Sequence, residues 1–170
     1  GEMVHRAIKL AGTPPGGPVY VRLPKDILRK TKIQQTIYPQ SSFNVPVAME
    51  PKTALIEEAT QLLINAKAPV INVGGEVTRA GAGADVLELA ELLSIPVAQG
   101  SSVFGDFPYG HPLFAGFSVG GVLPTVRQSD VFLNLGASMP DPTNFGAPVP
   151  TTTKVINARV EYNKIANIYP

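Results

Sequence analysis

Short apolar runs alternate with stripes of apolar residues at helical spacing along most of the chain. The runs predict strands near Val70, Val97, Val131 and Val155. The stripes predict helices over 51–66, 86–93 and 122–128. Because the runs are apolar along nearly their whole length, they are typical of strands that are covered on both faces. The pattern therefore predicts an α/β fold, a Rossmann-like parallel sheet with helices on both faces.

The first fifty residues follow a different pattern. Apolar residues recur at helical spacing over 2–11, and 18–23 reads as a short strand that is bounded by prolines. From there to Pro51 the chain has little periodicity and many polar residues and prolines, which is typical of a linker. Within the later part, 74–81 is expected to be a glycine turn and 100–121 a loop.

Composition narrows the classes of partner. The chain has 14 basic and 13 acidic side chains, so it lacks the positive excess that a nucleic-acid-binding surface needs. It has no cysteine, which excludes disulfide bonds and thiolate chemistry and fits a cytoplasmic location. No apolar run approaches the roughly 20 residues of a membrane span. We therefore expect no nucleic acid and no membrane as partner. With only two distant histidines, we also expect no metal ligands in this chain.

Residues that follow the predicted strands are the candidates for binding a ligand. They are Gly74, Gly75, Gly120, Gly121 and Asp141. Ligands of open α/β sheets sit beyond the carboxyl ends of the strands, where glycines let backbone amides approach a phosphate and an Asp can bind a ribose. Each candidate also has a structural interpretation, as a tight turn, a close packing contact or a turn-forming Asp. No G-x-G-x-x-G or P-loop motif and no catalytic group stands out.

Several segments in order resemble the thiamine-diphosphate-dependent enzymes, which include acetolactate synthase and benzoylformate decarboxylase. The matching segments are 13–26, 66–75, 79–82, 89–97, 107–116 and 129–136. The resemblance implies that 1–26 is the C-terminal remnant of a pyrimidine-binding domain and that 27–51 is a linker. It implies that 52–170 is a central domain, truncated at its C-terminal end.

The resemblance also implies a function. The chain would be the central, mainly structural domain of an enzyme that acts on 2-keto acids, a lyase or a transferase, with decarboxylation and carboligation both open. Thiamine diphosphate and magnesium would be bound outside this chain, because the family's catalytic glutamate would precede Gly1 and its Gly-Asp-Gly…Asn motif would follow Pro170. The partners would be the other domains of the parent chain, in a homodimer or homotetramer.

Some members of this family hold FAD or ADP in the central domain. The acetolactate-synthase-like pattern has a third glycine where this chain has Glu76, and an acidic residue near Asn157–Arg159. Both departures count against FAD binding. A Glu76 carboxylate that faces the crevice would repel a diphosphate unless an arginine pairs with Glu76 or with the phosphate. Two other interpretations stay open. One is a free-standing FAD-, ADP- or NAD-binding Rossmann-like domain, and the other is a non-enzymatic oligomerisation scaffold.

Overall fold

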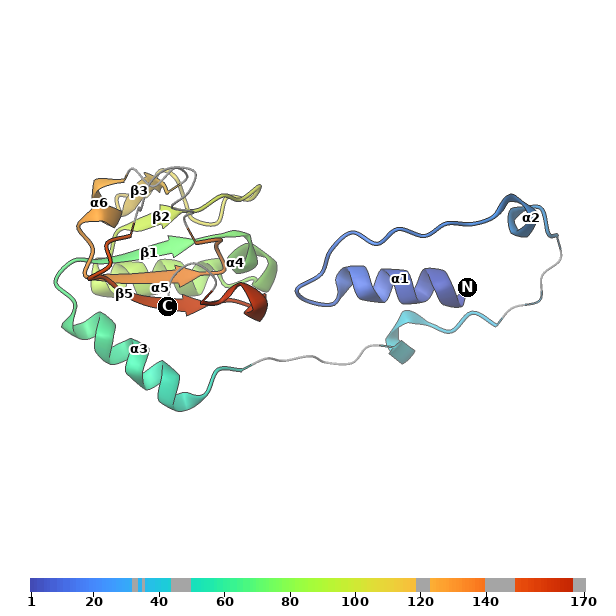
Figure 1. The fold of residues 1–170 in the computed structure, drawn as a ribbon, viewed down its shortest axis with the longest axis horizontal. Coiled ribbons are helices and arrows are strands. Elements are labelled where there is room, and N and C mark those ends of the chain that lie inside the picture. Colours follow the sequence, from blue (N-terminus) through green and yellow to red (C-terminus); the bar gives the residue numbers. More distant parts are fainter. Residues whose placement is uncertain (32–33, 35, 44–49, 119–122, 140–148, 167–170) are drawn as a thin grey trace. The chain divides into compact units, whose positions relative to one another are not determined.

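The chain folds as two compact units, 1–50 and 51–170. The computed structural model describes residues 1–31, 34, 36–43, 50–118, 123–139 and 149–166. Figure 1 shows the helices of the first unit and the sheet of the second. Among these residues, all strands belong to the second unit. Each unit is described by itself.

The first unit consists of short helices and extended segments. Helix α1 (Glu2–Gly12) confirms the helix that was predicted there, and α2 (Lys25–Leu28) and the 3-10 helix η1 (Gln40–Phe43) follow it. The strand predicted over 18–23 is wrong: these residues form no strand pairing. An extended segment becomes a strand only when a neighbour completes its hydrogen bonds, and the described part of this unit supplies no such neighbour.

The second unit is built on one parallel sheet. Its strands are β1 (Pro69–Val73), β2 (Val97–Gln99), β3 (Phe114–Phe117), β4 (Val131–Leu135) and β5 (Lys154–Ala158). They lie in the order β3-β2-β1-β4-β5, and every neighbouring pair is parallel. The register places Ile71 of β1 opposite both Val97 of β2 and Leu133 of β4. The four predicted strands and their parallel pairing are therefore confirmed.

Helices cover both faces of this sheet, as predicted. They are α3 (Thr53–Asn65), α4 (Gly75–Ala80), α5 (Gly83–Leu93) and α6 (Pro124–Arg127), with the 3-10 helix η2 (Tyr162–Lys164) after β5. Side chains alternate between the faces of a strand. One face, which includes Ile71 and Leu133, packs against Val86 of α5 and Val77 of α4. The other face, which includes Phe132, packs against Val126 of α6.

Two elements lie where the sequence predicted irregular structure. The predicted turn over 74–81 is mostly α4, and the predicted loop over 100–121 contains the edge strand β3. Glycines in both elements made the sequence look irregular. Gly75 begins α4. Gly116 of β3 has a φ of +114° and lies beside the register shift between β3 and β2. Both are held by tertiary contacts that local propensity does not reveal.

Asp130 fixes the amino-terminal edge of the sheet. Its carboxylate accepts the backbone N–H groups of Lys67, at 2.6 Å, and Ala68, at 3.0 Å. The hydrogen bond from Lys67 is the main reason why the pKa of Asp130 lies below its ordinary value. One side chain thus ties the segment before β1 to the start of β4.

Candidate functional site

The carboxyl ends of β1 and β4 are in direct contact. Gly74 is buried and extended, and its N–H donates to the carbonyl oxygen of Leu135 at 3.0 Å. A Cβ at Gly74 would lie 2.5 Å from the Cα of Ala137, so only glycine fits there. A Cβ at Gly75 would lie 3.2 Å from the Phe104 ring. At these two candidates, the missing side chains allow close packing of the chain on itself.

Glu76 carries the main electrostatic feature of this edge. Its Oε1 accepts Nη2 of Arg159 at 3.0 Å and Nε at 3.3 Å, and its Oε2 accepts the N–H of Val160 at 2.6 Å. The side chains of Arg159 and Glu76 are only 5% and 15% exposed. The carboxylate at the start of α4 is therefore hydrogen-bonded by the segment that follows β5.

A second carboxylate balances the same arginine. Nη2 of Arg159 lies 3.1 Å from Oε2 of Glu161, which also pairs with Nζ of Lys164 at 2.6 Å. The hydrogen bond from Lys164 is the main cause that lowers the pKa of Glu161. Two acidic and two basic side chains thus form a neutral network. The sequence had predicted repulsion from Glu76 unless an arginine paired with it, and the structure shows that pairing.

A row of buried amides crosses the sheet near the same edge. Asn72, Asn134 and Asn157 occupy matching register positions on β1, β4 and β5. Asn72 donates to Asn134 at 2.7 Å, and Asn134 donates to Asn157 at 3.0 Å and to the Ala137 carbonyl at 2.7 Å. The hydroxyl of Ser118 donates to Asn72 at 2.6 Å. We call these three asparagines the amide row. It satisfies polar groups in an otherwise apolar layer.

Sequence reasoning missed the amide row, although the chain carries a signal for it. Each of β1, β4 and β5 has an asparagine as its fourth residue, after one or more apolar residues. A polar side chain at the same place in three neighbouring parallel strands needs partners where it is buried, and its neighbours in register supply them. Of the candidate residues, Gly120, Gly121 and Asp141 lie outside the described part of the chain.

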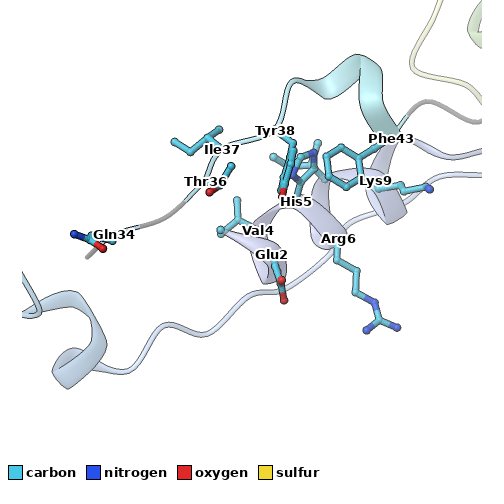
Figure 2. Close-up of a pocket in the computed structure, with 12 residues that line it drawn as sticks. Glu2, Val4, His5, Arg6, Lys9, Gln34, Thr36, Ile37, Tyr38 and Phe43 are labelled. Carbon is cyan, nitrogen blue, oxygen red and sulfur yellow. The ribbon is translucent and has the colours of Figure 1, made fainter. Parts of the chain in front are cut away.

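The first unit holds a groove of its own. The groove has a volume of about 940 Å³ and runs between α1 and the segment 34–43. Figure 2 shows His5, Tyr38 and Phe43 gathered beside α1, with Glu2 and Arg6 turned away from them. The rings of His5 and Phe43 are 4.1 Å apart, and those of Tyr38 and Phe43 are 6.2 Å apart. No described residue of this unit is buried, so the groove has no buried polar group that would fix a ligand.

The described residues were also searched for metal-binding clusters and membrane spans. They contain no group of three or more His, Cys, Asp or Glu side chains placed to hold a metal ion. Within the same ranges, no helix is long and apolar enough to cross a membrane.

Known proteins with similar sequences and folds agree on one family. Residues 56–170 match the family model for the thiamine pyrophosphate enzyme, central domain. The chain is 32% identical to a probable acetolactate synthase large subunit of Methanococcus aeolicus. The aligned 148 residues cover 82% of this chain and 24% of that relative. It is also 33% identical to the acetolactate synthase isozyme 3 large subunit of Escherichia coli. The aligned 150 residues cover 84% of this chain and 26% of that relative.

A solved structure shows the same likeness. The thiamine diphosphate-dependent 4-hydroxybenzoylformate decarboxylase of Rhodococcus jostii superposes with a TM-score of 0.75 at 26% identity, covering 98% of this chain and 33% of that one. The chain thus spans about a quarter of the length of the curated relatives and a third of this structure.

Proposed function

The chain belongs to the thiamine pyrophosphate enzyme family, whose central domain it carries, and on this premise we propose that it is a structural domain of an enzyme acting on 2-keto acids. The parent reaction is a decarboxylation or a carboligation. The chain itself contributes no catalytic residue. Its role is to hold the neighbouring domains of the parent protein in place.

One observation carries the structural role. At the carboxyl edge, where a parallel sheet of this type would bind a ligand, the chain makes contacts with itself. The N–H of Gly74 bonds to Leu135, and the carboxylate of Glu76 bonds to Arg159 and Val160. A catalytic edge would instead present polar groups to a substrate.

Thiamine diphosphate and magnesium have no cluster of three or more acidic or imidazole ligands among the residues that the structure describes. The diphosphate of that cofactor binds through a metal ion in the related enzymes, as the resemblance implies. We propose that both are bound by other domains of the parent protein. A cytoplasmic location belongs to the same proposal and is supported by the lack of cysteine.

Calorimetric titration of the 170-residue chain with thiamine diphosphate and magnesium tests the proposal. We expect no saturable heat and no release of carbon dioxide from benzoylformate or from a short aliphatic 2-keto acid. Saturable binding at roughly micromolar cofactor, or turnover of either acid, would contradict a purely structural role.

Assembly into a homodimer or homotetramer is also proposed. Tyr109, Phe114 and Phe117 form an aromatic cluster with ring centroids 5.1–5.5 Å apart, at the edge strand β3. Tyr109 and Phe117 are each 52% exposed. Exposed aromatic clusters favour contacts with other protein. Light scattering of the chain beside a Phe117→Ser variant should show a smaller mass for the variant; equal masses would count against this surface.

A further inference from the structure

The strand order identifies the place where a sheet of this kind would bind a ligand. In the order β3-β2-β1-β4-β5, the direction of winding reverses between β1 and β4. Ligands of open parallel sheets bind beyond the carboxyl ends of the strands at such a point. Here the two loops close on each other, since the N–H of Gly74 donates to Leu135 at 3.0 Å and the N–H of Glu76 donates to Gly136 at 3.3 Å.

The groups around the Glu76 carboxylate are those that bind anions. A guanidinium that presents two N–H donors and a free backbone N–H is a common donor set for carboxylate and phosphate oxygens. Arg159 and Val160 form that set at the end of β5, and Glu76 accepts from both residues. The guanidinium side chain is 5% exposed, so its charge is largely desolvated and needs a buried partner.

We propose that Arg159 and Val160 form an anion-binding site at the carboxyl end of β5 and that the carboxylate of Glu76 is its built-in occupant. The site accepts a diphosphate group, such as that of a nucleotide, only when Glu76 is removed. In the unaltered chain Glu76 excludes nucleotides by occupying the site. This inference goes beyond the proposed function, although both use the contact of Glu76 with Arg159 and Val160, and its test uses pyrophosphate in place of thiamine diphosphate.

The contact between Glu76 and Arg159 is the observation that supports this inference. In the structure these two residues form an ion pair, with Nη2 and Oε1 3.0 Å apart. The paired network has no net charge. Exclusion of a diphosphate therefore follows from occupation of the site. The sequence predicted repulsion by Glu76 unless an arginine paired with it, and Arg159 supplies that pair.

Titration with inorganic pyrophosphate tests the inference. Glu76→Ala removes the carboxylate and keeps the Cβ that packs at Gly136. Glu161→Gln is the matched control, because it removes the same charge from the same arginine at a side chain that is 28% exposed. Calorimetry should show no saturable binding below about 1 mM by the unaltered chain and by Glu161→Gln. Glu76→Ala should bind at least about tenfold more tightly.

The double variant Glu76→Ala/Arg159→Gln should lose this gain, and the Val160 amide resonance of Glu76→Ala should shift on titration. A gain of equal size in Glu161→Gln would show an effect of net charge and overturn the inference. So would a gain that persists without Arg159. Should Glu76→Ala fail to fold, as circular dichroism would show, Glu76→Gln takes its place in the same titrations, and no gain over the unaltered chain would overturn the inference. Saturable binding of pyrophosphate, ADP or FAD by the unaltered chain at roughly micromolar concentration would also overturn it.

Discussion

Replacement of Asn134 by alanine tests the amide row most directly. The side chain of Asn134 accepts from Asn72 at 2.7 Å and donates to Ala137 O at 2.7 Å and to Asn157 at 3.0 Å. Asn134 and Asn72 are completely buried, and Ala137 is 1% exposed. The change therefore leaves a buried amide donor and a buried carbonyl without their partner.

The expected loss follows from these groups. A buried polar group that loses its partner costs about 1–3 kcal/mol. Two such groups give about 2–6 kcal/mol, while the half-buried Asn157 has access to water. We therefore expect Asn134→Ala to lower the free energy of unfolding by about 4 kcal/mol, a large part of the roughly 5–15 kcal/mol that stabilises a typical domain.

Urea denaturation followed by circular dichroism measures this loss. With a slope of about 2 kcal/mol per molar urea, the midpoint should fall by about 2 M. Asn157→Ala is the control, because it removes the same side chain from the same row at the partly exposed strand β5, and it should cost only about 1 kcal/mol. If Asn134→Ala is no more destabilising than Asn157→Ala, the amide row does not stabilise the sheet as argued.

Three further predictions concern the ion pair, the pH dependence of stability and the glycine contact. Glu76→Gln and Arg159→Gln should each lower the free energy of unfolding by about 3 kcal/mol. Urea unfolding of the double variant should give a coupling energy between the two residues of about 1–3 kcal/mol. Strictly additive losses would show that the ion pair contributes nothing to stability. Because hydrogen bonds lower the folded-state pKa of Asp130, its stabilisation is complete above the ordinary carboxyl pKa and is lost as the pH falls through the lower folded-state value. Asp130→Asn should therefore flatten the acid limb of stability below about pH 4, as measured by thermal unfolding, and an unchanged limb would contradict this. Gly136→Ala should lower the free energy of unfolding by more than about 2 kcal/mol, because its Cβ would lie 2.5 Å from that of Glu76 at a φ of +62°. Its control is Gly83→Ala, whose Cβ would meet no atom within 4 Å and which should be neutral or stabilising by up to about 1 kcal/mol. Equal melting temperatures of the two variants would refute the close contact.

The strands and their direction were predictable because burial on both faces leaves a plain signal. The runs around Ile71, Val97 and Leu133 are apolar at nearly every position, and helical stripes separate them. The edge strand β3 gave no such signal, since its half-exposed residues Phe114–Phe117 depend on pairing with β2. The strand predicted over 18–23 failed for the opposite reason: its propensity was sufficient, but the described residues of the first unit offer it no neighbouring strand.

The position of the candidate site could be predicted from the sequence, but the contacts that its residues make could not. The sequence placed Gly74 and Gly75 after the first strand of the sheet, and they do lie at its carboxyl edge. Whether glycine there admits a phosphate or a neighbouring loop depends on Gly136 and Ala137, more than sixty residues later. The sequence likewise predicted that an arginine could pair with Glu76 without identifying it, and the contact with Arg159 joins residues 83 apart.

The place of β1 in the sheet has a consequence for synthesis on the ribosome. β1 is the first strand of the sheet to be translated, yet it lies in the middle and needs neighbours on both sides. Its partner Asn134 is 62 residues away from Asn72, a distance that takes about 3–12 s at ordinary translation rates. Throughout that interval the side of Pro69–Val73 that pairs with β4 has no partner, even once β2 is available on the other side. The amide of Asn72 interrupts this apolar strand, and a polar group within an apolar strand lowers its tendency to aggregate with other nascent chains.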